Sequence, residues 1–172
     1  PRGGPSHYSR TPYGLPQEVL QSGDLTGHLA WKWEHPRGLD TFVWGTLIDK
    51  DKNIYLIVSH GLYKLNPDGG VLWQREDITG IEMGAISGNA LCAMQMRVAV
   101  MNCVDTSSGK TLWNRTVAES TGKEGDMVTS NNGVLVAAVD AGYPDFGEAG
   151  QCSERVIGLN MSTGDELWTY KP

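Results

Sequence analysis

Four tryptophans that share one local sequence frame constrain the fold of this 172-residue chain more than any other feature. Each has a glycine four residues before it and a small or aliphatic residue directly before it. The tryptophans lie 42, 40 and 55 residues apart, and a period of about 40 to 50 residues is typical of the four-stranded blades of a β-propeller. The four pairs are Gly27 and Trp31, Gly69 and Trp73, Gly109 and Trp113, and Gly164 and Trp168.

The residues around each glycine predict a tight turn that leads into a strand. An Asp or Asn opens the unit, as in Asp105 to Trp113 and Asn160 to Trp168, and its side chain can bind backbone N–H groups of the turn. Glycine then supplies the positive φ that closes the turn. Because neighbouring blades cover both faces of a propeller sheet, a tryptophan at a fixed place can bury about 150 to 250 Å² against the next blade. We therefore expect the repeated tryptophans to hold neighbouring blades together.

The segments between the tryptophans complete three blades of four short strands each. The composition agrees, because 22 glycines, 8 prolines and only 20% charged residues favour tight turns over long helices. We expect an extended N-terminal arm over residues 1–20 and a partial propeller over 21–172, with a lone blade strand at 29–33 and blades at about 45–76, 83–117 and 127–170.

Three blades are too few to close a ring, since propellers have about four to eight blades. The predicted fold class is all-β: an incomplete propeller of three full blades plus one strand, which we expect to be part of a seven- or eight-bladed propeller. A bare half-propeller exposes two apolar sheet faces. We therefore favour a longer polypeptide that supplies the remaining blades over an association of copies that completes the ring.

The three cysteines, Cys92, Cys103 and Cys152, fit neither a disulfide framework nor a zinc-ligand spacing. Residues 90–95 and 98–104 are expected to form the two strands of a hairpin, and a symmetric hairpin places Cys92 opposite Cys103. Two interpretations stay open at this point, a disulfide between Cys92 and Cys103 or two buried thiols.

The repeated unit resembles the signature of the pyrroloquinoline-quinone-like repeat family, the propellers related to quinoprotein alcohol dehydrogenases. Leu159 to Trp168 and Leu65 to Trp73 are similar to two variants of its motif, Ala/Leu-x-Asp-x-x-Thr-Gly-x-x-x-Trp. Ser6 to Gly14 is similar to the segment that precedes the first blade, without the leading tryptophan of the family. The resemblance implies that the glycine turns join the third and fourth strands at one face of the disc. The connections between blades, and between second and third strands, then line the opposite face, where members bind ligands.

The resemblance is specific for fold and weak for function, because these propellers serve as dehydrogenases, outer-membrane assembly lipoproteins, assembly factors and sensor ectodomains. A quinone enzyme of the family would carry a disulfide between adjacent cysteines, a tryptophan floor, calcium ligands and an aspartate base. The two closest cysteines here are eleven positions apart. We therefore expect no catalytic residues and no cofactor, and keep a quinone-dependent dehydrogenase fragment and a ligand-sensing ectodomain as alternatives.

The segment 140–155 departs most from the repeat. It places aromatic and acidic side chains where a short link between two strands is expected, and long loops in compact domains are commonly functional. We predict a partner-binding loop in which Tyr143 and Phe146 are apolar anchors within an acidic rim that includes Asp145 and Glu148. A solvated decoration is the alternative.

Two further patterns give no metal site. Asp49 to Asn53 alternates oxygen-bearing side chains but lacks the glycine and the distant glutamate of a calcium loop, so we expect a hairpin turn. The four histidines show no ligand spacing, and surface or turn positions are expected for them. They are His7, His28, His35 and His60.

The net charge and hydropathy of the chain limit the classes of partner that we expect it to bind. The formal net charge is −6 with scattered Lys and Arg, which leaves no basic footprint for nucleic acid, and no run of about 18 apolar residues is present to span a membrane. The predicted function is a non-catalytic scaffold that binds other protein subunits, as an accessory subunit of a larger assembly. From the tendency of the family we expect it in an organelle lumen, the periplasm or the secreted space.

Overall fold

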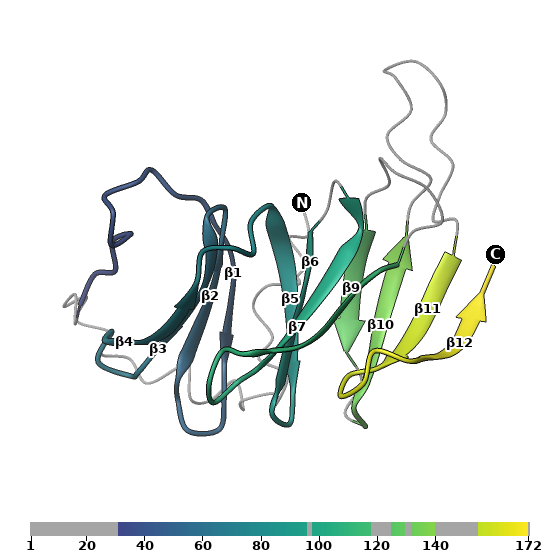
Figure 1. The fold of residues 1–172 in the computed structure, drawn as a ribbon. Coiled ribbons are helices and arrows are strands. Elements are labelled where there is room, and N and C mark those ends of the chain that lie inside the picture. Colours follow the sequence, from purple (N-terminus) through teal and green to yellow (C-terminus); the bar gives the residue numbers. More distant parts are fainter. Residues whose placement is uncertain (1–30, 96–97, 118–124, 130–131, 140–154, 172) are drawn as a thin grey trace, which may run out of the picture. The chain divides into compact units, whose positions relative to one another are not determined.

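The computed structural model describes residues 31–95, 98–117, 125–129, 132–139 and 155–171. In these residues, twelve strands form three antiparallel sheets of four strands each (Figure 1). The chain divides into two units, residues 1–33 and residues 34–172, and all three sheets belong to the second unit. In each sheet, strands that are consecutive in the chain are neighbours in space. The predicted all-β fold with four-stranded propeller blades is confirmed.

The three sheets are called blades 1, 2 and 3 in chain order. Their strands begin at residues 43, 81 and 125, slightly before the predicted blade starts. In blades 1 and 2 the first strand contains a β-bulge near this start. Blade 1 contains β1 (Val43–Ile48), β2 (Ile54–Val58), β3 (Gly61–Leu65) and β4 (Val71–Arg75). Blade 2 contains β5 (Ile81–Ser87), β6 (Ala90–Gln95), β7 (Val100–Asp105) and β8 (Thr111–Thr116). Blade 3 contains β9 (Gly125–Thr129), β10 (Val134–Val139), β11 (Arg155–Asn160) and β12 (Glu166–Tyr170).

The lone strand predicted at 29–33 is not formed by its described residues. Trp31, Lys32 and Trp33 have no strand geometry, and residues 29 and 30, like the predicted arm over 1–20, lie outside the described residues. A strand requires a hydrogen-bonded neighbour. The strand was predicted outside the three full blades. The described residues form only the three four-stranded sheets, and residues 31–33 are not a strand of any of them.

Glycine turns join the third and fourth strands of all three blades, as the repeat predicts. Gly69, Gly109 and Gly164 have φ values of +85°, +69° and +77°, a region that side-chain-bearing residues adopt only at a cost. In blade 2 the carboxylate of Asp105 accepts hydrogen bonds from the backbone N–H groups of Ser107 at 3.1 Å and Ser108 at 2.8 Å. The turn therefore follows from local side-chain chemistry.

The Asp105 turn gives a pH-dependent prediction. Hydrogen bonds from Ser107 and then Ser108 lower the pKa of Asp105 to about 2. Because the unfolded pKa is about 3.9, the stabilisation is fully present above that pH and is lost as the pH falls through about 2. We expect the Asp105 carboxyl to titrate near pH 2 by NMR, and Ser107→Ala to raise this midpoint. An unchanged midpoint in that variant, or a wild-type midpoint near 4, would contradict the assignment.

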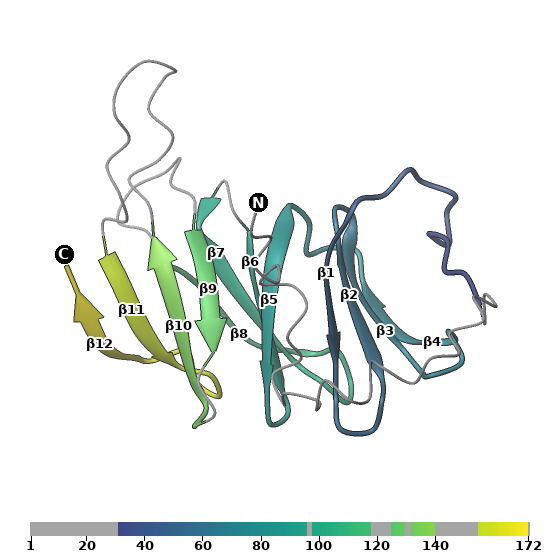
Figure 2. The same cartoon turned by 180° about the vertical axis from the view of Figure 1, so that it is seen from behind.

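The apolar core lies between the blades. One buried cluster includes Tyr55 and Ile57 of blade 1, Leu91 and Met101 of blade 2, and Leu159 of blade 3. The first strands of the blades also pack side by side: β1 contacts β5, and β5 contacts β9 (Figures 1 and 2). Each blade thus buries apolar side chains against its neighbour, which is how a propeller gains stability.

Candidate interaction surface

The connections between blades lie at the end of the sheets opposite the glycine turns (Figure 1). β1, β5 and β9 start at this end, and the turn of Ser59 and His60 between β2 and β3 lies there too. In blade 3 the matching connection, between β10 and β11, is the segment 140–154. We call this end the connection face. The strand ends at this face are those that the connections between blades, and between second and third strands, join, as the family resemblance implies.

An exposed aromatic pair lies at the connection face where β1 begins. The side chains of Phe42 and Trp44 are 73% and 44% exposed, and their ring centroids are 5.8 Å apart. Trp44 is the extra residue of a β-bulge between Val43 and Gly45, and bulges commonly redirect a side chain next to a functional site. Phe42, Val43 and Trp44 are called the β1 aromatic patch.

The backbone of the β1 aromatic patch is held by the β2–β3 turn. The N–H of Ser59 donates to the carbonyl oxygen of Phe42 at 3.0 Å, and the N–H of Phe42 donates to Ser59 Oγ at 3.3 Å. These bonds extend the pairing of β1 with β2 by one residue. The patch is therefore presented on an anchored strand end rather than on a free loop.

A hydrogen-bond chain that runs from the buried His35 to the surface anchors the segment that leads into the patch. His35 Nε2 lies 2.9 Å from the hydroxyl of Tyr63, which donates to Glu76 Oε1 at 3.0 Å. Glu76 Oε2 pairs with Arg37 Nη2 at 3.0 Å. Burial, together with the Glu76 bond, raises the pKa of Tyr63 to about 12, so this phenol remains a donor at neutral pH. His35 is only 5% exposed, so it does not lie at the surface, because Tyr63 gives it a buried partner, but it does open a turn in which its carbonyl accepts the N–H of Gly38 at 2.7 Å.

The first seam between blades joins the repeated tryptophan of blade 1 to the glycine turn of blade 2. A Cβ placed on Gly109 would lie 2.9 Å from Trp73 Cδ2, so the indole packs directly on this turn. The indole N–H donates to the carbonyl of Thr106 at 3.0 Å. Arg75, two residues after the tryptophan, donates to the carbonyl of Gly109 at 2.8 Å.

The second seam repeats these contacts between blades 2 and 3. A Cβ on Gly164 would lie 2.6 Å from Trp113 Cδ2, and the Trp113 N–H donates to the carbonyl of Met161 at 2.8 Å. Arg115 donates to the carbonyl of Gly164 at 2.7 Å. The repeated Trp-x-Arg at Trp73 and Trp113 is the sequence signal for these arginine contacts, which the prediction from the repeat missed.

The other two repeated tryptophans are Trp168 in blade 3 and Trp31 before blade 1. Trp168 is 43% exposed and lies against Gly158 of its own sheet. Trp31 belongs to the first unit of the chain, and Gly27 lies outside the described residues. The indole of blade 3 therefore has the sequence frame of the other two without their burial.

A buried lysine at the first seam was not predicted. Lys64 is 8% exposed, and its Nζ donates to the carbonyl of Thr106 at 3.0 Å and lies 3.8 Å from Asp49 Oδ2. Asp49 also accepts hydrogen bonds from Asn53 and from the hydroxyl of Tyr55. Burial raises the pKa of Asp49, but these hydrogen bonds outweigh it, and the net shift is downward. The residues 49–53 thus form a hydrogen-bonded hairpin turn.

Comparison with known proteins now decides the family. The family model described as outer membrane protein assembly factor BamB matches residues 58–172. The chain belongs to this BamB family of pyrroloquinoline-quinone-like repeats. No curated protein sequence matches it.

Solved structures similar to this BamB-family chain share its fold at low sequence identity. BamB from Moraxella catarrhalis is 18% identical with a TM-score of 0.54, over 74% of this chain and 36% of that one. A europium-containing methanol dehydrogenase is 17% identical with a TM-score of 0.57, over 77% and 26%. The computationally designed Ika4 protein is 9% identical with a TM-score of 0.58, over 81% and 79%. The chain thus spans about a third of the first of these relatives and about a quarter of the second.

The partner-binding loop predicted for this BamB-family chain lies outside the described residues, with Tyr143, Asp145, Phe146 and Glu148. Within the described ranges, no three His, Cys, Asp or Glu side chains gather to hold a metal ion. The same residues contain no helix of the length and apolarity needed to cross a bilayer.

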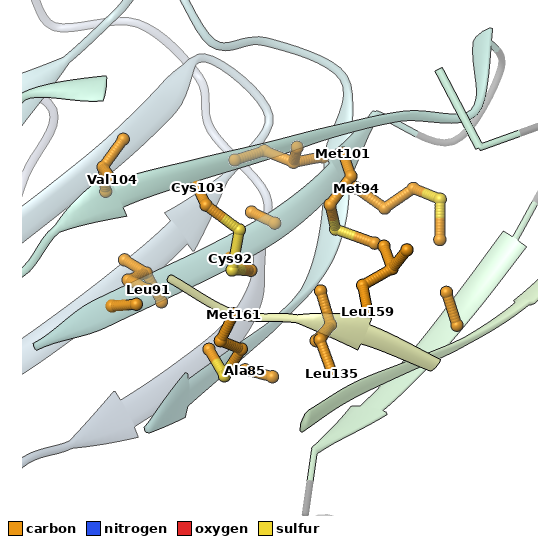
Figure 3. Packing of buried hydrophobic residues seen from close by; sticks show 14 of the residues in the cluster. Ala85, Leu91, Cys92, Met94, Met101, Cys103, Val104, Leu135, Leu159 and Met161 are labelled. Carbon is orange, nitrogen blue, oxygen red and sulfur yellow. A yellow bond between two sulfur atoms is a disulfide. The ribbon is translucent and has the colours of Figure 1, made fainter. Parts of the chain in front are cut away.

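The two cysteines considered for a disulfide lie side by side in blade 2 (Figure 3). Cys92 on β6 is paired in register with Cys103 on β7, at a Cα–Cα distance of 4.0 Å, and a disulfide joins their sulfur atoms. Both side chains are fully buried. Cys152 lies outside the described residues.

Proposed function

We propose that this chain is part of a propeller scaffold that binds other protein subunits through its connection face, as an accessory subunit of a larger assembly outside the cytosol. Membership of the BamB family, whose name denotes an assembly factor, supports a role in an assembly. The β1 aromatic patch is the observation that carries the proposal, because it is the aromatic surface that the connection face exposes around β1.

The composition of the patch suits protein recognition. Aromatic side chains are enriched at the centres of protein interfaces and supply a large share of their binding energy. Phe42 exposes 73% of its surface and Trp44 exposes 44%, so both offer apolar area to a partner without unfolding. The bonds between Phe42 and Ser59 hold the strand end in place, which lowers the entropy that a partner must remove on binding.

The segment 140–154 joins β10 to β11 in the sequence. We keep the prediction that Tyr143 and Phe146 anchor a partner there, within a rim that includes Asp145 and Glu148. The chain would then bind through two elements of one face, a fixed aromatic strand end and an inserted loop.

Substitutions in the patch test this function. We expect Phe42→Ala combined with Trp44→Ala to weaken partner binding about 30-fold or more, since a pair of central aromatic contacts contributes about 2 kcal/mol or more in total. The partner is first identified by cross-linking to the wild-type chain in its native assembly, and the Kd is then measured by calorimetry with purified components.

Two controls make the test decisive. Leu72→Ala removes an apolar side chain that is 53% exposed on β4 near the Gly69 turn, at the end opposite the connection face, and we expect it to leave the Kd unchanged. Deletion of residues 141–154 tests the inserted loop separately. Unchanged affinity in both the patch variant and the deletion would overturn the proposal, and dye reduction that depends on added quinone would favour the dehydrogenase alternative.

A further inference from the structure

The Cys92–Cys103 pair occupies a position beside the repeated tryptophan of its blade. Cys103 on β7 lies opposite Trp113 on β8 in the sheet register. This position lies next to the contacts of Trp113 with blade 3, and the other blades fill it with different chemistry. The equivalent pair is Tyr55 and Lys64 beside Trp73 in blade 1, and Val136 and Gly158 beside Trp168 in blade 3.

Both cysteines are inaccessible while blades 2 and 3 are packed together. Each has 0% exposed surface. They belong to a buried cluster that also contains Leu135, Leu159 and Met161 of blade 3, which Figure 3 shows around them. Trp113 and Arg115 close the seam between the two blades through Gly164 and Met161. No reductant can therefore reach the sulfur atoms without movement at this seam.

We propose that the Cys92–Cys103 disulfide is a redox lock on the seam between blades 2 and 3. A thiol reductant reaches the disulfide only when the seam opens, and the reduced chain holds the seam less tightly. The inference depends on the blade packing alone and is independent of the proposed partner binding.

The chemistry is ordinary thiol–disulfide exchange. A thiolate of a small dithiol attacks one sulfur, forms a mixed disulfide and releases the other cysteine as a thiolate. The second thiol of the reductant then displaces the protein and closes a cyclic disulfide. The dithiol loses two electrons, and both cysteines end as protonated thiols. Oxidised glutathione, a small-molecule disulfide, reverses the change by accepting two electrons and leaving as two thiols.

The reduced state strains the packing for a steric reason. Bonded sulfur atoms lie about 2.05 Å apart, whereas atoms that are not bonded need about 3.5 Å or more. Protein interiors are close-packed, with few voids to take up such a change. The two thiols therefore need more room within the buried cluster that they share with blade 3, and we expect the contact of Trp113 with the Gly164 turn to loosen.

Reduction kinetics test the first half of the proposal. The full chain, with Cys152 replaced by serine, is treated with dithiothreitol, and Cys92 and Cys103 are quantified by alkylation and mass spectrometry. We expect the folded chain to react at least about tenfold more slowly than the chain in urea, because exchange must wait for an opening event.

Matched arginine variants locate that opening. Arg115→Gln removes a charged hydrogen bond to the Gly164 carbonyl at the second seam, and we expect it to speed reduction about tenfold. Arg75→Gln removes the same bond to Gly109 at the first seam, and we expect no change beyond its effect on global unfolding, measured in parallel. Equal acceleration by both variants, reduction of the folded chain as fast as of the unfolded one, or free thiols before any reductant would each overturn the lock.

Indole hydrogen exchange tests the second half. We expect the Trp113 Nε1–H, bonded to Met161, to exchange about tenfold faster in the reduced chain than in the oxidised chain. The Trp73 Nε1–H, bonded to Thr106 at the other seam, is the internal control and should exchange at the same rate in both states. Equal rates for Trp113 in the two redox states would show that the disulfide does not act on the seam.

Discussion

Replacing Trp113 with alanine is expected to lower the free energy of unfolding by about 3 kcal/mol. The indole packs on the Gly164 turn of the next blade and donates a hydrogen bond to the carbonyl of Met161. Alanine leaves a cavity at the seam and removes the donor from that carbonyl, and both changes destabilise the folded state. Urea unfolding, followed by circular dichroism, measures the change.

Trp168→Ala is the matched control for this prediction. Trp168 has the same sequence frame but is 43% exposed and lies against its own sheet. Its removal is expected to change the free energy of unfolding by less than about 1 kcal/mol. Equal destabilisation by the two substitutions would mean that the packing between blades 2 and 3 does not depend on the repeated tryptophan.

The blades were predictable because their determinants are local. Each blade is a meander whose strands pair with their neighbours in the chain, and each glycine turn is closed by an Asp or Asn side chain a few residues away, as at Asp105. A period of about 40 residues then identifies the architecture without any long-range information. The family resemblance rests on these same residues, and it therefore predicted the fold far better than the function.

The seams and the patch were not predictable because they depend on distant residues. Lys64 looks like an exposed strand residue, yet it is buried because its ammonium group donates a hydrogen bond to the carbonyl of Thr106, 42 positions later. His35 is buried by Tyr63, 28 positions away. From the sequence, Trp44 has the pattern of an apolar strand residue that would be buried. In the structure it is the extra residue of the bulge in β1 and is 44% exposed.

The two ends of the blades therefore carry different constraints. At the glycine-turn end, each seam needs a glycine, an indole and an arginine in fixed places, so the sequence there repeats. At the connection face the described residues carry an exposed aromatic strand end in blade 1, and in blade 3 the sequence between β10 and β11 departs from the repeat. Variable segments on a fixed scaffold are the usual arrangement for recognition, which is the basis of the proposed function.

Replacing Gly164 with alanine is expected to lower the free energy of unfolding by about 3 kcal/mol, by two separable effects. The φ of +77° costs a side-chain-bearing residue about 1 kcal/mol. The new Cβ would also lie 2.6 Å from Trp113 Cδ2, so the indole must move off the turn. Gly88→Ala is the control for the first effect, because Gly88 has a φ of +59° and no atom within 4 Å of the added Cβ. It should cost only about 1 kcal/mol.

A double-mutant cycle isolates the steric effect. In a chain that already carries Trp113→Ala, the collision partner of the new Cβ is gone, so Gly164→Ala should then cost no more than Gly88→Ala does. The expected coupling energy between positions 113 and 164 is about 2 kcal/mol, well above the additivity error of distant sites. Urea unfolding of the four chains measures it. Additive effects would mean that glycine is needed at position 164 for its backbone conformation alone, and not because the next blade packs its tryptophan there.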